Sequence, residues 1–307
     1  MQTLRLFLHL SNHGGQTQSV KGGCRIMPKF KPIDMPVGTA NPLDVAVSNR
    51  DRNTLAMVAK ALEHNQTRLA FQPVIVAGDT PRVGFHEGLI RVIDDTGRVI
   101  PAKDFMPAVE RAELGREIDV NALHLGLRAL HQNPSIRLSI NMSARSIGYQ
   151  RWMQTLNRWL RKDDSVGERL ILEITESSAM DQPELVIDFI DRLSARGVCF
   201  ALDDFGAGYT ALRYLKDFYF DVLKIDMQFC HGIADDHDTQ VLTRAMIQIG
   251  QHFDMLVVAE GVERAEDVAC LMEMGVDCLQ GYYFAAPEIR PDWLRGQGKG
   301  KKTSQIA

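Results

Sequence analysis

The segment Val198–Gly208 reads Val-Cys-Phe-Ala-Leu-Asp-Asp-Phe-Gly-Ala-Gly, an apolar run that ends in two adjacent carboxylates and a glycine-rich turn. The apolar half is typical of a buried strand. Neighbouring residues on a strand point to opposite faces, so Asp203 and Asp204 cannot both be a solvated surface pair unless the strand has already ended. Two carboxylates beside an apolar run need a compensating cation, and a metal ion is the simplest candidate.

Apolar runs of this kind recur along the chain and alternate with amphipathic helical stretches. The runs span residues 69–76, 86–93, 138–142, 170–175, 198–202, 222–225, 256–259 and 278–284. The helical stretches span residues 104–131, 149–161, 183–196, 209–217, 235–252 and 263–275. Nearly continuous hydrophobic strands that alternate with helices favour a parallel sheet covered by helices, and about eight such strands suit a TIM (β/α)8 barrel.

The first two runs depart from this pattern. The linker between them is about nine residues long, includes Gly78 and Pro81, and is too short for a helical crossover. We therefore expect an antiparallel hairpin at the start of the sheet. The predicted fold class is α/β, a modified TIM (β/α)8 barrel with an antiparallel first strand pair.

The barrel is predicted to occupy residues 51–292. Residues 1–50 are rich in Gly, Pro, Asn and Ser and are expected to form a disordered arm or linker, and residues 293–307 a flexible basic tail. The formal net charge is −4 with a pI near 6.1, which argues against binding to a nucleic acid polymer or an anionic membrane.

The cysteines and the N-terminus bear on the cellular compartment. The five cysteines, Cys24, Cys199, Cys230, Cys270 and Cys278, form no CxxC pair and no even disulfide framework. The opening Met1–Leu10 lacks a good small-residue cleavage site and is too short to span a bilayer. We expect a cytoplasmic protein in a reducing compartment, without membrane insertion.

Nearly every apolar run carries a polar residue at its C-terminal half or end. These residues are Gln72, Glu87, Asn141, Glu173, Glu176, Asp203, Asp204, Lys224, Asp226, Glu260, Glu263 and Gln280. In a TIM barrel the C-terminal ends of the strands meet at one rim, where catalytic groups gather. One such residue is readily explained as a satisfied polar group of the core, but the whole set converging on one rim indicates a functional site.

The chemistry of this set points to hard divalent cations. Carboxylates and an amide oxygen, without Cys or paired His ligands, suit Mg²⁺ or Mn²⁺ better than zinc. The adjacent Asp203 and Asp204 would let one aspartate bridge two cations about 3.5–4 Å apart, the arrangement used in phosphoester hydrolysis. Lys224 then fits as the group that orients or deprotonates the attacking water.

These residues closely resemble the EAL family of cyclic-di-GMP phosphodiesterases, in order and in spacing, over about residues 55–290. The segments that carry the resemblance are Glu87-Gly88-Leu89-Ile90-Arg91, Asn141-Met142-Ser143-Ala144-Arg145, Leu172-Glu173-Ile174-Thr175-Glu176, Asp203-Asp204-Phe205-Gly206-Ala207-Gly208-Tyr209, Lys224-Ile225-Asp226, Ala259-Glu260-Gly261-Val262-Glu263 and Gln280-Gly281-Tyr282.

The resemblance implies hydrolysis of cyclic-di-GMP to linear pGpG with two Mg²⁺ or Mn²⁺ ions, and a homodimer. By position, Glu87, Asn141, Glu173 and Asp203 would hold one metal ion, and Asp203, Asp204 and Glu260 would hold the second. Lys224 would position the water and Gln280 would assist. The substrate-binding residues would be Gln72, Arg91 and Asp226, and Glu263 would hold the loop Asp204–Thr210 in place.

Two positions depart from the family pattern. The signature tripeptide has Gly88 where alanine is usual, which keeps the glutamate but is expected to loosen its strand by about 0.5–1 kcal/mol. Val92 stands where an aromatic residue is common, and the substitution is expected to remove packing around the guanine or the strand. These departures bear on affinity more than on the chemistry.

Two alternative functions remain open at this point. Gly206-x-Gly208-x-x-Ala211 matches a dinucleotide-binding fingerprint, with Asp226 about twenty residues further on, but Asp203 and Asp204 would repel a pyrophosphate. The other alternative is a receptor or protein-interaction module on the same fold that binds cyclic-di-GMP without hydrolysis. The presence of Glu173, Asp204 and Lys224 favours the enzyme, because a receptor could lose these residues at little cost.

Overall fold

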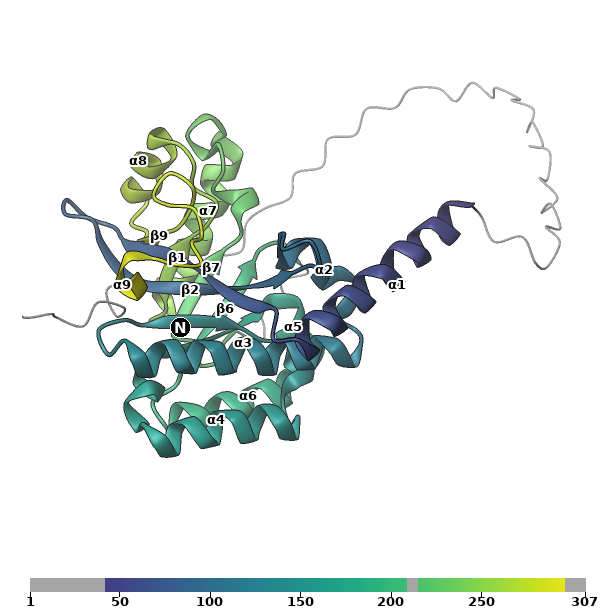
Figure 1. The fold of residues 1–307 in the computed structure, drawn as a ribbon. Coiled ribbons are helices and arrows are strands. Elements are labelled where there is room, and N and C mark those ends of the chain that lie inside the picture. The colour runs from purple at the N-terminus through teal and green to yellow at the C-terminus, as the bar shows by residue number, and fades with distance from the viewer. Residues whose placement is uncertain (1–41, 209–214, 296–307) are drawn as a thin grey trace, which may run out of the picture.

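The computed structural model describes residues 42–208 and 215–295. Its centre is a closed barrel of eight strands (Figure 1). Around the ring these are β1 (Thr67–Val76), β9 (Cys278–Leu279), β8 (Leu256–Ala259), β7 (Val222–Ile225), β6 (Cys199–Phe205), β5 (Leu170–Thr175), β4 (Leu138–Asn141) and β2 (Arg82–Ile93). A short strand, β3 (Val99–Pro101), pairs with β2 outside the ring.

The barrel closes through the antiparallel pair that the sequence predicts. Strands β1 and β2 pair along their length, from Thr67 opposite Val92 to Val76 opposite Arg82. β1 also runs antiparallel to β9, whereas the steps from β2 through β4 to β9 are parallel. The predicted modified TIM barrel is therefore confirmed.

Helices surround the barrel (Figure 1). They are α1 (Pro42–Glu63), α2 (Ala102–Val109), α3 (Glu113–Gln132), α4 (Gln150–Lys162), α5 (Glu176–Asp181), α6 (Pro183–Ser194), α7 (His237–His252), α8 (Ala265–Glu273) and α9 (Asp292–Arg295). Short 3₁₀ turns include η1 (Ala144–Ser146), η2 (Asp164–Arg169), η4 (Met227–Phe229) and η5 (Ile233–Asp235). None of the helices in the described ranges is long and apolar enough to cross a bilayer.

The strands bury both faces because their side chains alternate between the barrel interior and the exterior that the helices cover. Outward residues such as Leu172 and Phe200 pack with helix residues such as Leu127 and Phe189 in one large hydrophobic cluster. Inward residues form a smaller apolar cluster at the closed end of the barrel: Val74, Phe85, Ile171, Ala201, Val222, Val258 and Cys278. This two-sided burial explains why the strands read as nearly continuous apolar runs.

Several predicted element boundaries were wrong. The run 278–284 is a strand only over Cys278–Leu279, and the stretch 104–131 is two helices interrupted at residues 110–112. The strand expected to end at residue 202 continues to Phe205 and includes both aspartates. The predicted helix 209–217 lies mostly outside the described residues.

The ends of the barrel domain also differ from the expected boundaries. Helix α1 begins at Pro42, so residues 42–50 are helical rather than an unstructured arm, and residues 1–41 lie outside the described range. At the other end, Trp293 packs against the core and belongs to α9 rather than to a flexible tail.

Candidate active site

The site forms the next layer of the barrel interior. Side chains on a strand return to the same face every second residue, so the layer above the inner apolar cluster lies two residues further along each parallel strand. Phe85, Ile171, Ala201, Val222, Val258 and Cys278 are thus followed by Glu87, Glu173, Asp203, Lys224, Glu260 and Gln280. In β1, which runs the other way, Val74 is preceded by Gln72. The predicted convergence of polar groups on one rim is what this periodicity produces.

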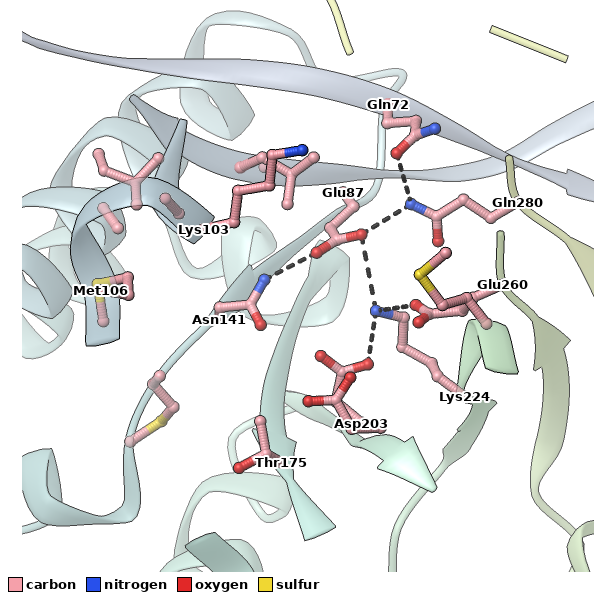
Figure 2. Close-up of a pocket in the computed structure, with 18 of the residues that line it drawn as sticks. Gln72, Glu87, Lys103, Met106, Asn141, Thr175, Asp203, Lys224, Glu260 and Gln280 are labelled. Carbon is pink, nitrogen blue, oxygen red and sulfur yellow. Dashed lines mark hydrogen bonds and ion pairs between the residues drawn. The ribbon is translucent and has the colours of Figure 1, made fainter. Parts of the chain in front are cut away.

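Lys224 lies at the centre of this layer (Figure 2). Its ammonium nitrogen is 2.6 Å from Glu260 Oε1, 2.8 Å from Asp203 Oδ1, 3.0 Å from Glu173 Oε2 and 3.6 Å from Glu87 Oε2. The side chain is 1% exposed, yet the four carboxylates outweigh the cost of burial and raise the pKa of Lys224 well above its usual value. The lysine is therefore charged in this environment.

The acidic groups outnumber this cation. Burial raises the pKa of Glu173 well above its usual value, and the nearby Glu87 adds to the effect. Burial also raises the pKa of Glu260 to about 8, against the opposing influence of Lys224. For Glu87, Lys224 and the hydrogen bonds to its carboxylate outweigh burial, so its pKa is lowered. The site thus holds more negative charge than one ammonium can balance.

Asp204 joins the site through a local distortion of β6. Its φ is +55°, in the left-handed region, and the pairing of β6 with β7 shifts register between Leu202 and Phe205. Short polar residues such as Asp tolerate this conformation better than most. The distortion interrupts the strict alternation of the strand, and carboxylate oxygens of Asp203, Asp204 and Glu260 come within 4.8 Å of one another. Burial and the adjacent Asp203 raise the pKa of Asp204 to about 6.

A chain of amides holds the remaining residues in place (Figure 2). Asn141 Nδ2 donates to Glu87 Oε1 at 2.8 Å, and Gln280 Nε2 donates to Glu87 Oε2 at 2.7 Å. Gln280 Nε2 also lies 3.2 Å from Gln72 Oε1. The buried Oε1 of Gln280 and the Oε1 of Glu173 have no hydrogen-bond donor among the described residues. Gln280 lines the cavity, so its Oε1 is available there as an acceptor.

Glu176 contacts the glycine-rich loop after the aspartates. Gly206 N donates to Glu176 Oε2 at 3.0 Å, and Glu176 is 1% exposed. Glu263 is exposed, and its carboxylate lies 3.9 Å from His231 Nδ1. Within the described part of the loop, Asp204–Gly208, Glu176 provides a side-chain acceptor, and the holding role expected of Glu263 stays a prediction. The sequence signal was present, because Glu176 directly follows the strand that carries Glu173.

The expected substrate-binding residues differ in their placement. Gln72 lines the cavity with the metal-ligand candidates. Arg91 is not among the lining residues, and its Nη1 donates to its neighbour's carbonyl, Ile90 O, at 3.0 Å. Asp226 caps the turn η4 by accepting from Gln228 N at 2.8 Å, and it does not line the cavity either.

The site opens into a cavity of about 770 Å³. Its walls include three charged residues that sequence reasoning missed: Lys103 on α2, Glu110 directly after α2, and Asp119 on α3. Asp119 accepts hydrogen bonds from Ser143 N at 3.0 Å and Ser146 Oγ at 2.6 Å, which fixes the turn directly after Asn141. Burial raises its pKa to about 7. An acid on the apolar face of a predicted helix, between Ile118 and Ala122, was the available signal.

The two departures from the family pattern have structural explanations. Ile140 packs directly against Gly88. A Cβ at residue 88 would lie only 2.6 Å from the isoleucine Cδ1, so a larger residue would clash unless Ile140 moved. Besides the loosening of the strand expected of Gly88, the glycine therefore makes room for Ile140. Val92 is fully buried in the outer hydrophobic cluster and does not line the cavity, so its size bears on that core rather than on a ligand.

The donor set fits divalent cations. Five carboxyl groups, those of Glu87, Glu173, Asp203, Asp204 and Glu260, surround one ammonium, so full ionisation would leave a formal charge of −4. Two divalent cations would balance that charge. The donors are oxygens throughout, as Mg²⁺ and Mn²⁺ prefer, and the unpartnered Glu173 Oε1 is a ready ligand atom.

Comparison with known proteins agrees with this geometry. The family model described as EAL domain matches residues 55–287. The chain is 30% identical over 233 residues to the bifunctional diguanylate cyclase/cyclic di-GMP phosphodiesterase MucR of Pseudomonas aeruginosa, covering 74% of this chain and 34% of that protein. It is also 30% identical over 255 residues to the cyclic di-GMP phosphodiesterase PdeF of Escherichia coli, covering 81% and 33%. The chain thus spans about a third of the length of these relatives.

Solved structures are similar over the same region. A structure titled PaMucR phosphodiesterase, c-di-GMP complex, superposes with a TM-score of 0.67 at 29% identity, covering 77% of this chain and 97% of the other. The EAL domain of FimX from Pseudomonas aeruginosa bound to c-di-GMP gives a TM-score of 0.71 at 25% identity, covering 78% and 98%. Both matches cover almost the whole of the other chain, so the similarity extends over a complete domain.

Proposed function

Because this chain belongs to the EAL domain family, we propose that it is a metal-dependent phosphodiesterase that hydrolyses one phosphodiester of cyclic-di-GMP to linear pGpG. The observation that carries the proposal is the ring of oxygen donors around Lys224, supplied by strands on all sides of one cavity. Names of relatives give the substrate class, and two similar structures hold c-di-GMP.

We assign the metal ligands by position in this ring. Glu87, Asn141, Glu173 and Asp203 would hold one Mg²⁺ or Mn²⁺ ion, and Asp203, Asp204 and Glu260 a second. The close approach of the carboxylates of Asp203, Asp204 and Glu260 supports the second group. Bound divalent cations at such a site stabilise charge on the phosphoryl oxygens and lower the pKa of a bound water.

The chain's own polar groups then handle the water. The Lys224 ammonium can donate to only some of its four carboxylate neighbours at once, since it carries three N–H bonds. When cations share those carboxylates, an N–H of Lys224 is free to hold the attacking water. Gln280 presents its unpartnered Oε1 as an acceptor for the same water, while its Nε2 keeps the Glu87 carboxylate in place.

For the nucleotide, we propose contacts from Gln72 at the cavity wall and from Arg91 and Asp226 outside it. Arg91 is half-buried, and the neighbouring Glu87 and Tyr282 favour its charge, while burial lowers its pKa. A charged guanidinium at this edge suits a phosphate. Glu263, which lines the cavity mouth, is proposed to act there rather than on the loop.

The experiment that tests the proposal is turnover of cyclic-di-GMP by the purified chain with Mg²⁺, Mn²⁺ or EDTA, separating substrate, pGpG and GMP by chromatography. We expect pGpG only with metal, and none from Glu87→Gln or Lys224→Met. A thermal shift with cyclic-di-GMP and Ca²⁺, without product under any metal, would instead indicate the receptor alternative. If neither product nor thermal shift were seen, both the phosphodiesterase and the receptor alternative would be contradicted.

The resemblance and the composition also support proposals about the assembly, the cellular compartment and the domain limits of this chain. We propose a homodimer, testable by light scattering of the purified chain. A cytoplasmic location and a barrel domain over residues 51–292 rest on the resemblance and composition described above. The extra helical turns from Pro42 suggest that an expression boundary at residue 42 will give a more stable domain than one at residue 51.

A further inference from the structure

The C-terminal segment beyond the family match folds back onto the strands that carry the site. The match ends at residue 287, and the next residue pairs with β1. Phe71 N donates to Glu288 O at 2.8 Å, and Glu288 N donates to Phe71 O at 3.0 Å. Figure 1 shows α9 beside β1 and β2. We call residues 285–294 the C-terminal clasp.

Trp293 is the main side-chain contact of the clasp. Its ring meets Phe71 edge-on with centroids 4.9 Å apart, and His86 with centroids 5.4 Å apart. Its indole Nε1 donates to His86 Nε2 at 3.2 Å. Because an indole N–H can only donate, this hydrogen bond requires the neutral His86 ring with Nε2 unprotonated. The contact therefore fixes both the position and the tautomer of His86.

Both residues that Trp293 contacts adjoin residues of the site. Phe71 precedes Gln72 and His86 precedes Glu87, and Gln72 lies directly opposite Glu87 in the β1–β2 ladder. Since alternate residues point to opposite faces, Trp293 packs outside the barrel on the immediate neighbours of two inward-facing site residues. Movement of either strand at this point would displace Glu87, a ligand candidate, or Gln72.

The clasp also reaches the site through an amide relay. Ala285 O accepts a hydrogen bond from Gln72 Nε2 at 3.1 Å, which turns the Gln72 carbonyl towards Gln280 at 3.2 Å. Gln280 then directs its Nε2 to Glu87 Oε2 at 2.7 Å (Figure 2). A flipped Gln72 amide would present its N–H₂ to Gln280 and break the relay, because two N–H groups cannot bond each other.

We propose that the C-terminal clasp sets the cation affinity of the candidate site, with Trp293 as a positioning residue that holds Glu87 through His86 and Gln72 through Phe71. The proposal rests on the proposed function only in taking Glu87 as a metal ligand. Residues that orient metal ligands typically change metal affinity by about 10–100-fold when mutated. Trp293 acts one residue further away, and we expect a smaller effect, about threefold to tenfold.

The test is Mn²⁺ affinity without nucleotide, measured from the signal of free Mn²⁺ by electron paramagnetic resonance. Trp293→Phe keeps an aromatic ring but removes the donor to His86, and it should weaken Mn²⁺ binding about threefold to tenfold. Saturating Mn²⁺ should restore its turnover. Met153→Ala, in helix α4 and also packed on the core but outside the clasp, is the control for loss of stability and should leave Mn²⁺ affinity unchanged.

Each outcome decides the matter. Wild-type affinity in Trp293→Phe, with normal wild-type turnover, would overturn the clasp proposal and leave the phosphodiesterase standing. The wild-type protein could instead bind Mn²⁺ but hydrolyse no cyclic-di-GMP. Weaker Mn²⁺ binding by Trp293→Phe would then support the clasp proposal, while the missing turnover would overturn the proposed function. Equal weakening in Met153→Ala would overturn the positioning role, and a wild-type chain that binds no Mn²⁺ would overturn both proposals.

Discussion

The Cδ1 methyl of Ile140 occupies the space that a side chain at Gly88 would need, since a Cβ at residue 88 would lie 2.6 Å from it. Gly126 of helix α3 meets the same isoleucine, and a Cβ there would lie 2.7 Å from Cδ1. Two glycines on different elements thus make room for one large side chain. The glycine in the signature tripeptide is part of a matched packing arrangement directly beside Glu87.

Restoring the usual alanine should therefore destabilise the protein. Gly88→Ala removes an entropic cost of about 0.5–1 kcal/mol in the strand, but overpacking against Ile140 costs about 1–3 kcal/mol. In an Ile140→Val background the clashing methyl is gone, and the same substitution should be neutral or stabilising. Urea unfolding of the four proteins in this double-mutant cycle measures the coupling; equal effects of Gly88→Ala in both backgrounds would contradict the packing explanation.

Glu173→Gln should separate stability from function. The Glu173 side chain is fully buried among other carboxylates, and its pKa is raised well above the usual value, first by burial and then by Glu87. A neutral isostere removes the cost of protonating this buried carboxyl on folding, so we expect the metal-free protein to gain about 0.5–2 kcal/mol at neutral pH, the size of a typical stabilising substitution. Mn²⁺ affinity and turnover should fall by at least about tenfold, the lower end for a lost ligand contact.

The matched control for this substitution is Glu184→Gln, an exposed glutamate in the first turn of α6. It should change neither the stability in EDTA nor the Mn²⁺ affinity. Urea unfolding with EDTA and a Mn²⁺ titration give both quantities. A Glu173→Gln protein that is less stable than the wild type without metal would argue against an excess of negative charge in the site.

The metal-free protein should lose stability as the pH rises from about 5 to 8. The folded-state pKa values of Asp204, Asp119 and Glu260 are raised to about 6, 7 and 8, mainly by burial. The folded protein therefore keeps protons that the unfolded chain has released. Stability is highest below the unfolded pKa values and falls as the pH rises through the folded ones, by up to about 1.4 kcal/mol per pH unit for each proton retained.

Urea unfolding in EDTA at several pH values measures this slope. Glu87 does not alter its sign in this window, because its pKa is lowered and its titration lies below the usual value for glutamate. Added Mn²⁺ should flatten the profile by compensating the carboxylates. Asp119→Asn, which removes a titrating carboxyl that is not itself a ligand candidate, should reduce the slope between pH 5 and 7; stability that rises over this range in EDTA would refute the assignment.

Glu176 rather than Glu263 should control the loop after the aspartates. Glu176→Ala removes the acceptor for Gly206 N and leaves a half-buried backbone donor without its partner, at a cost of up to about 1–3 kcal/mol. We expect weaker Mn²⁺ binding and lower turnover, with substantial recovery in Glu176→Gln, which keeps a carbonyl acceptor. Glu263→Gln should leave Mn²⁺ affinity near the wild-type value. Mn²⁺ affinity should be measured for all three variants. A larger loss of affinity in Glu263→Gln than in Glu176→Ala would contradict this assignment.

The sequence by itself determined the barrel and most members of the site. Apolar runs buried on both faces define the strands. The linker after β1 is too short for a helical crossover, so its length alone predicts the antiparallel start. On each parallel strand, a polar residue lies two positions after an inward-facing apolar residue. This spacing locates the layer of Glu87, Glu173 and Lys224. These are local properties, which periodicity and spacing carry.

Only the tertiary structure decided the relationships between strands. The sequence does not reveal that Asp204 adopts φ = +55° and shares a cluster with Glu260, because that depends on the register shift between β6 and β7. Nor does it reveal that Glu176 reaches Gly206, that Ile140 needs Gly88, or that Trp293 packs on His86. Each of these contacts joins residues far apart in the chain, and their geometry is set by how the strands and helices pack rather than by any local pattern.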